Sequence, residues 1–543
     1  MEILDVRNLT FTYSNGKDPV INDVSFTVGE GDFVVVCGST GSGKSTLLRL
    51  LKKELNPIGT REGKIFIDGE EIIEDDEEQR SFSHRIGFVM QNPKEQIVTD
   101  KVWHELAFGL ENIGVDRNTM ASKIAEIAGY FGIEDWYEKN VNDLSGGQMQ
   151  LLNLASVMVM DPDILILDEP SAQLDPVSAS SLFATIEKLN KDFALTVIIA
   201  EHRLEELIPV CSRMMIIEEG RIKSYGTPRE VIGTIGPENR IFPALPAAYR
   251  LYRKIGSDIR EFPLTVREGR NLVKNIAKDG YLWGKSRRKV ENTKDGSGKC
   301  EPALSFKNVS FRFSADGDDV IKDLNLDIGT GEIFCILGGN GSGKTTALNI
   351  AAGILKPYCG YIKVFGKKLK EYKNGSLYNK CLSMLPQDVQ TVFLHNTVRE
   401  EMESMKGMEK LKDYPYDISP LLDKNPYDLS GGEQQIAALA KVYATEPRLI
   451  LMDEPTKGLD AYRKQEFISM LKNFKDKGIT CVVVTHDVEL AAAVADRCAL
   501  FFRGEAVSVG NPYEFFVNNN FYTTLTVRLT KGICEPEITL DER

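Results

Sequence analysis

Apolar and polar positions alternate at the start of each half of this chain, over residues 3–9 and again over residues 304–309, which predicts a strand in both places. A run without polar residues follows each of them, Phe33-Val34-Val35-Val36-Cys37 and Ile333-Phe334-Cys335-Ile336-Leu337. Such runs are typical of strands buried on both faces of a parallel sheet. A helical pattern comes directly after each run, and strands that alternate with helices indicate an α/β fold.

Each apolar run ends at the same kind of glycine-rich loop. The loop residues are Gly38, Ser39, Thr40, Gly41, Ser42, Gly43, Lys44, Ser45 and Thr46 in the first half, and Gly338, Gly339, Asn340, Gly341, Ser342, Gly343, Lys344, Thr345 and Thr346 in the second. Glycines let backbone N–H groups turn toward a phosphate, and the helix that begins there adds its positive end. We expect Lys44 and Lys344 to reach the β- and γ-phosphates of ATP, and Ser45 and Thr345 to place a hydroxyl on Mg²⁺.

A second pair of apolar runs delivers two carboxylates each, Asp168-Glu169 in the first half and Asp453-Glu454 in the second. Ligands of parallel sheets bind at this edge, where the strands end. The first carboxylate of each pair is expected to hold Mg²⁺ through water, and the second to orient the attacking water. A single copy could equally be a solvated acidic turn, but its repetition behind a phosphate loop favours catalysis.

A Leu-Ser-Gly-Gly sequence precedes a helical pattern in both halves. Its residues are Ser145, Gly146, Gly147 and Gln148 in the first half, and Ser430, Gly431, Gly432 and Glu433 in the second. On its own, Ser-Gly-Gly is a common helix cap or turn. Here the serine and the N–H groups at the helix start predict a second anion site in each half.

The motifs recur in the same order, which indicates a duplication. The two lysines of the phosphate loops are 300 positions apart, whereas Ser145 and Ser430 are 285 apart, so the first half has about fifteen extra residues between these motifs. We predict domains at 1–231 and 303–543. Residues 232–302 are predicted to be a small helical extension of the first half that ends in a flexible polar linker over 285–299.

With these motifs in place, the chain resembles the ATP-binding cassette (ABC) family over nearly its whole length. The resemblance implies two tandem RecA-like P-loop NTPase domains, each with a helical subdomain, that form an intramolecular pair. In that family the Leu-Ser-Gly-Gly element of one half closes over the ATP held by the other half. Leu151 and Ile436 depart from the family pattern, which often has an arginine there, and Glu433 replaces the usual glutamine.

The resemblance assigns roles to further residues. Gln91 and Gln387 match the glutamine that senses Mg²⁺ and the attacking water, and His202 and His486 match the switch histidine that contacts the γ-phosphate. Lone histidines are more often structural, but two of only five in the chain fall at this position. The segments that match the loop linking the two sites are 171–175 and 456–460. Tyr13 and Phe313 match the aromatic that stacks on adenine, although each could be an ordinary strand aromatic.

Residues 92–112, after Gln91, resemble the ATPases of energy-coupling-factor (ECF) transporters, as does the segment 243–268. This resemblance implies import of a vitamin or a transition-metal ion, a transmembrane coupling protein, a separate substrate-binding membrane protein, and a place on the cytoplasmic face of the membrane. Acidic and amide groups after each glutamine are expected to pair with an arginine of the coupling protein, unless they form a solvated face. They are Glu95, Gln96, Asp100, Glu105, Asp388, Gln390 and Glu400.

The alternative is a soluble tandem ABC ATPase that acts on ribosomes or nucleic acid. The net charge of −13 disfavours nucleic acid, because proteins that grip phosphates are usually basic. No long basic helix joins the halves, although such an arm is common in that class of protein. A tandem sugar-importer ATPase is also disfavoured, because one half of those proteins often carries degraded motifs, whereas no motif is degraded here. Nine cysteines, scattered singly, indicate reduced thiols in the cytosol. We see neither a secretory signal nor an apolar run of about 18 to 20 residues that would span a bilayer.

Overall fold

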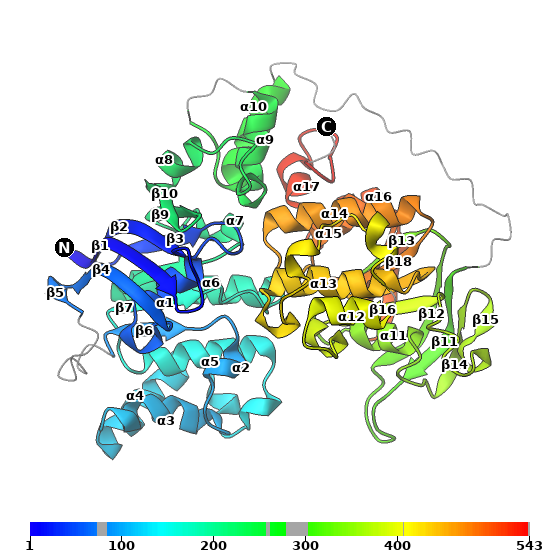
Figure 1. Cartoon of the computed structure of the whole chain (residues 1–543), viewed down its shortest axis with the longest axis horizontal. Coiled ribbons are helices and arrows are strands. Elements are labelled where there is room, and N and C mark those ends of the chain that lie inside the picture. Colours follow the sequence, from blue (N-terminus) through cyan, green and yellow to red (C-terminus); the bar gives the residue numbers. More distant parts are fainter. Residues whose placement is uncertain (73–83, 257–260, 279–301, 406, 541–543) are drawn as a thin grey trace. The chain divides into compact units, whose positions relative to one another are not determined.

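The computed structural model describes residues 1–72, 84–256, 261–278, 302–405 and 407–540. The chain divides into two compact units, Met1–Pro246 and Ala247–Arg543. Each unit contains a six-stranded sheet, a four-stranded sheet and the helices that cover them (Figure 1). The predicted fold class, two tandem α/β domains, is therefore confirmed.

The six-stranded sheet of the first unit has the order β10-β9-β3-β8-β7-β6. Its strands are β3 (Phe33–Cys37), β6 (Ile86–Val89), β7 (Ile164–Asp168), β8 (Thr196–Ala200), β9 (Arg213–Glu218) and β10 (Arg221–Gly226). All pairs are parallel except β9 with β10. Every residue of β3, β7 and β8 is buried, as expected for strands covered on both faces.

The four-stranded sheet of the first unit is antiparallel, with the order β2-β1-β4-β5. Its strands are β1 (Glu2–Tyr13), β2 (Ile21–Gly29), β4 (Gly59–Ile67) and β5 (Glu70–Glu71). Leu4, Val6, Leu9 and Phe11 of β1 are buried. The alternation predicted the first strand, but its antiparallel partners were not foreseen, because alternation says that one face is covered without saying by what.

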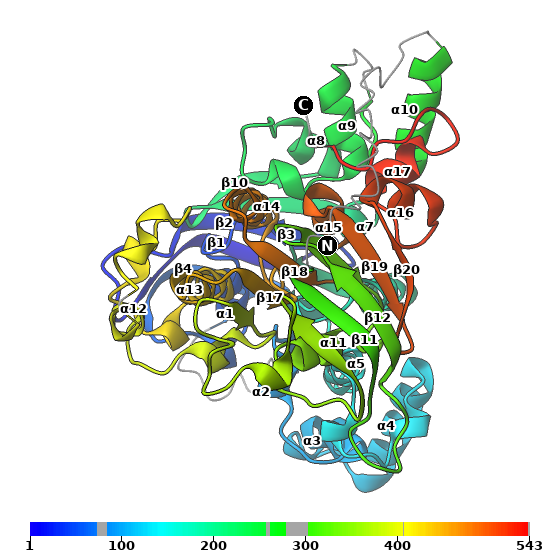
Figure 2. The same ribbon diagram turned by 90° about the vertical axis from the view of Figure 1, so that its right-hand side faces the viewer.

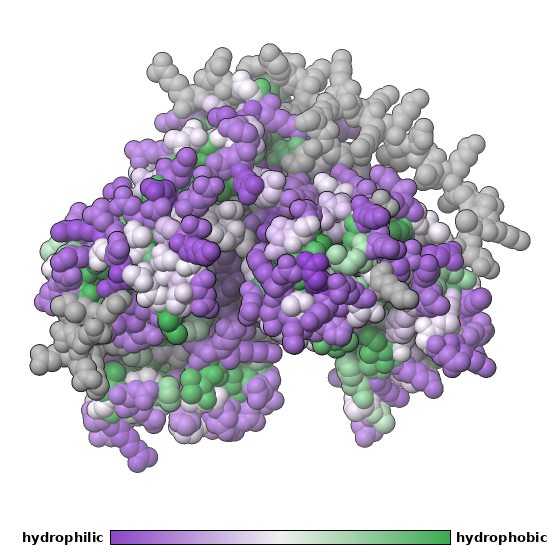
Figure 3. All heavy atoms as spheres, viewed as in Figure 1, coloured by the Kyte–Doolittle hydropathy of each residue, from purple (hydrophilic) through white to green (hydrophobic). Residues whose placement is uncertain are grey.

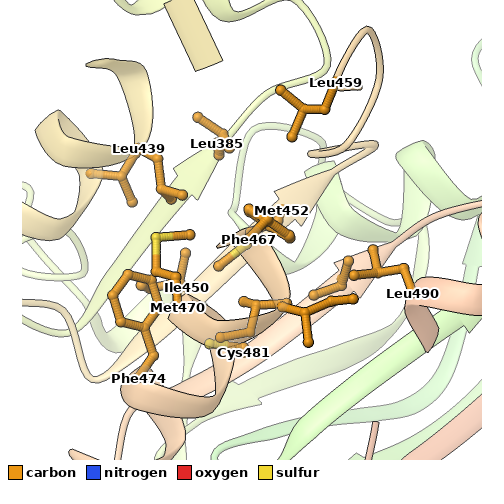
Figure 4. Packing of buried hydrophobic residues seen from close by; sticks show 14 of the residues in the cluster. Leu385, Leu439, Ile450, Met452, Leu459, Phe467, Met470, Phe474, Cys481 and Leu490 are labelled. Carbon is orange, nitrogen blue, oxygen red and sulfur yellow. The ribbon is translucent and has the colours of Figure 1, made fainter. Parts of the chain in front are cut away.

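The second unit repeats both sheets, with the orders β12-β11-β14-β15 and β16-β17-β18-β13-β19-β20 (Figure 2). The strands are β11 (Leu304–Phe311), β12 (Ile321–Ile328), β13 (Ile333–Leu337), β14 (Cys359–Val364), β15 (Lys367–Lys368), β16 (Leu382–Leu385), β17 (Leu449–Asp453), β18 (Thr480–Val484), β19 (Arg497–Phe502) and β20 (Glu505–Gly510). Strands β17 and β18 contribute Ile450, Met452 and Cys481 to an apolar core that also contains Phe467 and Phe474 (Figure 4). This core holds the strand ends that carry the predicted site.

The helices of the first unit are α1 (Lys44–Leu50), α2 (Pro93–Gln96), α3 (Val102–Asn112), α4 (Arg117–Phe131), α5 (Gly146–Met158), α6 (Pro176–Phe193), α7 (Leu204–Leu207) and α8 (Pro228–Gly233). Helices α3 and α4 pack on α5 and form the predicted helical subdomain. Asp116 caps the start of α4, and Gly132 ends it in the left-handed conformation.

The second unit contains α11 (Lys344–Ala351), α12 (Val398–Ser404), α13 (Gly431–Ala444), α14 (Ala461–Asp476), α15 (Val488–Val494), α16 (Pro512–Asn518) and α17 (Leu525–Thr530). Between α12 and α13, the described residues form only short 3₁₀ turns, at Lys410–Asp413, Ser419–Leu421 and Pro426–Asp428. Helix α4 of the first unit therefore accounts for most of the extra residues seen in the sequence.

The segment between the two halves forms α9 (Ala247–Ile255) and α10 (Val266–Lys278). Their apolar faces pack together and against α17, in a cluster that includes Ala248, Leu251, Val273 and Leu529. The sequence interpretation attached this segment to the first half, whereas its packing places it in the second unit. The boundaries at 231 and 302 stay predictions, and the linker over 285–299 lies outside the described residues. Within those residues, no helix combines the length and apolar character needed to cross a membrane.

Candidate active sites

The first phosphate loop connects β3 to α1 and is shaped by its glycines. Gly43 has a φ of 101°, a conformation that residues with a side chain rarely adopt. A Cβ on Gly38 would lie 2.3 Å from the carbonyl oxygen of Ile217, so the neighbouring strand leaves no room for one. The Lys44 ammonium donates to the carbonyl oxygens of Gly38 and Ser39, at 2.9 and 3.2 Å. The loop thus curls around its own lysine.

The second phosphate loop repeats this geometry between β13 and α11. Lys344 donates to the carbonyl oxygens of Gly338 and Gly339, both at 2.9 Å, and Gly343 has a φ of 98°. The hydroxyl oxygens of Ser42 and Ser342 are buried, and neither has a hydrogen-bond partner among the residues the structure describes. Polar atoms buried in this way fit a site built for a polar ligand such as a phosphate group.

The predicted Mg²⁺ residues meet in both units. Ser45 donates to Asp168 at 2.9 Å, and Thr345 is hydrogen-bonded to Asp453. Burial, together with the charge of Glu169, raises the pKa of Asp168 from 3.8 to about 6. Burial also raises the pKa of Asp453 to about 6, against the opposing effect of Thr345.

One oxygen of Asp453, Oδ1, is buried without a hydrogen-bond partner within the described part of the chain. A hydroxyl beside a buried carboxylate is a donor set that suits Mg²⁺. When bound, the ion would neutralise charge that develops on the phosphates. The residues at both sites fit that role.

The second carboxylate of the first pair lies at the centre of the predicted catalytic group. Glu169 Oε1 is 2.9 Å from Nε2 of His202, and Gln91 donates its amide to Oε2 at 3.0 Å. Lys44 Nζ lies 3.8 Å from the same carboxylate. The structure therefore brings Gln91, Glu169 and His202 together beside the phosphate loop.

In the second unit Glu454 Oε2 lies 2.9 Å from Nδ1 of His486 and accepts the backbone N–H of the same residue at 3.3 Å. Gln387 is exposed, and no contact joins it to Glu454 in the way that Gln91 joins Glu169, so its sensing role stays a prediction. Glu169 and Glu454 both have positive φ, 45° and 48°. Strained backbone of this kind is concentrated at functional sites, where the surroundings hold it in place.

The two Leu-Ser-Gly-Gly elements form capping boxes at the starts of α5 and α13. Ser145 accepts the N–H of Gln148, whose side chain accepts the N–H of Ser145. Ser430 and Glu433 are related in the same way. Gln148 and Glu433 thus stabilise the helix starts, while the predicted anion-binding role of these elements stays a prediction.

The two predicted adenine-stacking aromatics have different surroundings. The hydroxyl of Tyr13 is hydrogen-bonded to Thr46 of the phosphate loop at 3.0 Å. Phe313 has no hydroxyl and is 71% exposed, with its ring 5.0 Å from that of Phe311. Stacking on adenine stays a prediction for both.

Buried carboxylates that the sequence interpretation missed or misplaced hold the loops around these sites. Glu105 accepts the N–H groups of Val98 and Thr99, at 3.1 and 2.8 Å, and is buried. It therefore cannot pair with an arginine on another protein, as the sequence interpretation proposed. Its counterpart Glu401 accepts the N–H groups of the matching residues Leu394 and His395 and pairs with Lys441 at 2.6 Å. Glu105 and Glu401 lie equally far along the sequence from Gln91 and Gln387, respectively. This equal spacing is the sequence signal that could have identified them as a pair.

Comparison with known proteins places the chain in a family. A sequence family described as "ABC transporter" matches residues 21–172 and 321–457. A protein of Bacillus thuringiensis subsp. konkukian (strain 97-27), which its name assigns to the ABC transporter ATP-binding proteins, is 35% identical over 529 residues, 96% of this chain and 94% of that protein. A protein of the same name from Clostridium tetani (strain Massachusetts / E88) is 32% identical over 440 residues, 79% of this chain and 96% of the relative.

A solved structure shares the fold over most of this chain. The archaeal ribosome recycling factor, in complex with a ribosomal stalk protein, matches with a TM-score of 0.59 and 20% identity over 94% of this chain and 91% of that chain. The structure of cbiO1 from Clostridium perfringens, part of the ABC transporter complex cbiONQ, is 29% identical over 43% of this chain and 91% of that chain, with a TM-score of 0.40. Two matches to one family and relatives that align over nearly the whole chain lead to one conclusion: this chain belongs to the ABC transporter ATP-binding family and is an ATP-hydrolysing protein with two tandem nucleotide-binding cassettes.

Proposed function

We propose that the protein is the ATP-hydrolysing subunit of an ECF-type importer for a vitamin or a transition-metal ion, and that it docks on a transmembrane coupling protein through the segment after each sensing glutamine. The observation that carries this proposal is a pair of exposed aliphatic side chains at matching positions. Val98 is 66% exposed and Leu394 is 81% exposed, and each lies seven residues after Gln91 or Gln387.

Both side chains are held in place from inside the protein. The buried carboxylates Glu105 and Glu401 bind the backbone N–H groups of Val98 and Leu394, so each loop is fixed with its apolar side chain outward. An aliphatic side chain that an ordered loop holds in water carries a solvation cost, and this chain has one at both matching positions. A bound partner would remove that cost by covering the two side chains. Trp103 of α3, five residues after Val98, is also exposed in the first cassette.

The surface is joined to the nucleotide site in the first cassette. Gln91 bonds to Glu169 and is followed directly by α2 and the Val98 loop, so a change at the γ-phosphate would reach the loop through few residues. Apolar residues, drawn in green, gather over the part of the first unit that carries α2 to α5 (Figure 3). Glu95 and Asp100 are also exposed here and remain available to a basic partner group, unlike Glu105.

The test is capture of membrane proteins by the tagged full chain from detergent-solubilised membranes. Val98→Asp and Leu394→Asp are expected to weaken capture of a transmembrane protein at least about tenfold, because a buried charge at the centre of an interface is costly, while ATP binding is unchanged. Ile113→Asp and Ile354→Asp are matched controls, since these aliphatic side chains are 49% and 62% exposed away from the two loops.

Equal capture by the wild type and both loop variants would contradict the docking surface. Recovery of ribosomes in place of any membrane protein would replace the proposal with the soluble, ribosome-associated alternative. Identification of the small molecule carried by a captured membrane complex would then name the imported substrate.

A further inference from the structure

The residues on either side of the switch histidine differ between the two cassettes. His202 lies between Glu201 and Arg203, whereas His486 lies between Thr485 and Asp487. Glu201 is only 2% exposed. An acidic side chain is rarely buried this completely without strong hydrogen bonds. The hydrogen-bond partners of Glu201 therefore indicate its role.

Glu201 ties two catalytic segments together. Its Oε1 accepts the N–H of Ser171, which lies two residues after Glu169, at 2.9 Å. Its Oε2 accepts the N–H groups of His202 and Arg203, at 2.9 and 3.4 Å. One carboxylate therefore holds the switch-histidine loop and the start of the loop over residues 171–175.

Arg203 makes a second connection between the same two loops. Its guanidinium donates to the carbonyl oxygen of Leu174 at 3.0 Å. Asp175 then caps α6, which fixes the far end of the 171–175 loop. The switch histidine of the first cassette is thus flanked by two residues that grip this loop at both of its ends.

The second cassette carries different groups at the two positions that flank its histidine. Thr485 replaces the carboxylate and accepts the N–H of Asp487 at 3.0 Å. Asp487 replaces the arginine and pairs with Lys464 of α14 at 2.7 Å. A carboxylate cannot donate to a loop carbonyl as Arg203 does, and Ala179 stands where Lys464 would be in the first cassette. The two cassettes therefore hold the residues around the switch histidine through different side chains.

We propose that Glu201 is a positioning residue of the first ATP site, and that with Arg203 it forms a latch that makes the switch histidine and the 171–175 loop move as one body. Hydrolysis in the first cassette then depends on a connection that the second cassette lacks, so the two ATP sites are not equivalent. The latch acts by keeping His202 within 2.9 Å of Glu169. Misplacement of a catalytic group by about 1 Å can cost on the order of 100-fold in rate.

The latch is tested on the full chain by measuring the first hydrolysis event at one site while the other is silenced. Glu454→Gln silences the second site, because loss of a positioned base costs on the order of 10² to 10⁴-fold. In that background Glu201→Thr, which introduces the second cassette's residue, is expected to slow first-site hydrolysis about tenfold in rapid-quench experiments and to change the Kd for ATP less than about twofold. Glu201→Gln, which keeps one acceptor oxygen, should give an intermediate rate.

The reciprocal background shows whether the effect belongs to one site. With Glu169→Gln silencing the first site, Glu201→Thr should change second-site hydrolysis by less than about twofold. Asp32→Asn is a matched control, because Asp32 also accepts a backbone N–H, that of Gly29, but lies at a turn of the sheet. It should leave both rates unchanged.

An unchanged first-site rate in folded Glu201→Thr would overturn the proposal, as would an equal loss at both sites. Should Glu201→Thr fail to fold, Arg203→Met provides the test, because it removes the donor to Leu174 and keeps an aliphatic stem. It is expected to slow the first site at least about threefold, and an unchanged rate would equally overturn the latch. This inference rests on ATP hydrolysis alone, so the absence of a membrane partner would not affect it.

Discussion

At the scale of single residues, Asp168 and Asp453, the predicted Mg²⁺ residues, are carboxylates whose charged form opposes folding. Each ends a strand that is buried along its whole length, and burial raises the pKa of each carboxyl from 3.8 to about 6. The folded chain without Mg²⁺ therefore binds these protons more tightly than the unfolded chain does. The free energy of unfolding consequently falls as pH rises from about 4 to about 6, where native aspartates lose their protons.

Asp168→Asn is expected to remove this cost and to stabilise the nucleotide-free protein while abolishing Mg²⁺-dependent hydrolysis. A shift from 3.8 to about 6 limits the gain in unfolding free energy to about 3 kcal/mol at neutral pH. Thermal unfolding of wild type and variant at pH 5 and pH 8 measures it, and the gain should be larger at pH 8. Asp143→Asn, at an exposed position, is the control. A gain that does not vary with pH would show that the charge of Asp168 is not its cause.

At the scale of single elements, the strands that lead to the sites could be predicted closely. The runs at 33–37 and 333–337 coincide with β3 and β13, because a strand buried on both faces needs an apolar residue at every position. The phosphate-loop residues directly follow such strands and the paired carboxylates lie at their ends, so the sequence order alone placed them. The latch was missed because Glu201 binds Ser171 thirty residues away, and the pairing of those two positions leaves no local pattern.

Helices α9 and α10 show the same limit at a longer range. Their helical pattern was visible, but their partner α17 lies about 250 residues further along the chain. Gly269 of α10 marks the contact: a Cβ there would lie 2.6 Å from Cδ2 of Leu529 and 2.8 Å from Cβ of Ala248. Arg270 of the same helix donates to the carbonyl oxygens of Arg528 and Lys531. The segment between the cassettes is therefore held by the end of the second one.

Gly269→Ala should loosen this contact, although alanine normally favours a helix by about 1 kcal/mol over glycine. The added methyl group overpacks the interface, which typically costs about 1 to 3 kcal/mol. Hydrogen exchange should become faster in α9, α10 and α17 and stay unchanged in β3 and β13. Asn271→Ala, on the exposed side of α10, is the control and should slow exchange or leave it unchanged. Slower exchange in Gly269→Ala would contradict this prediction, because it would mean that the helices can move apart for the added methyl group without losing their packing.

At the scale of the whole molecule, the remaining question is whether each ATP site is completed by the other cassette. Each Leu-Ser-Gly-Gly element caps the helix that it begins, so Ser145 and Ser430 have a structural role within their own units. The capping bonds engage only some of the N–H groups at the starts of α5 and α13. N–H groups at the start of a helix bind anions well. Family resemblance predicts that Ser430 faces the nucleotide at Lys44, and that Ser145 faces the one at Lys344.

Ser430→Arg should therefore block hydrolysis at the first site, although the substituted residue lies in the second cassette. With Glu454→Gln silencing the second site, first-turnover hydrolysis is expected to fall at least about 100-fold, because a bulky cation would prevent closure over the γ-phosphate. ATP binding to Lys44 should persist, since the phosphate loop itself is unchanged. Ser145→Arg is the matched control: it makes the same change in the first cassette and should affect the Lys344 site instead, measured with Glu169→Gln in place of Glu454→Gln. If each substitution inhibited only the site of its own cassette, the two sites would be independent, and the model of an intramolecular pair would have to be abandoned.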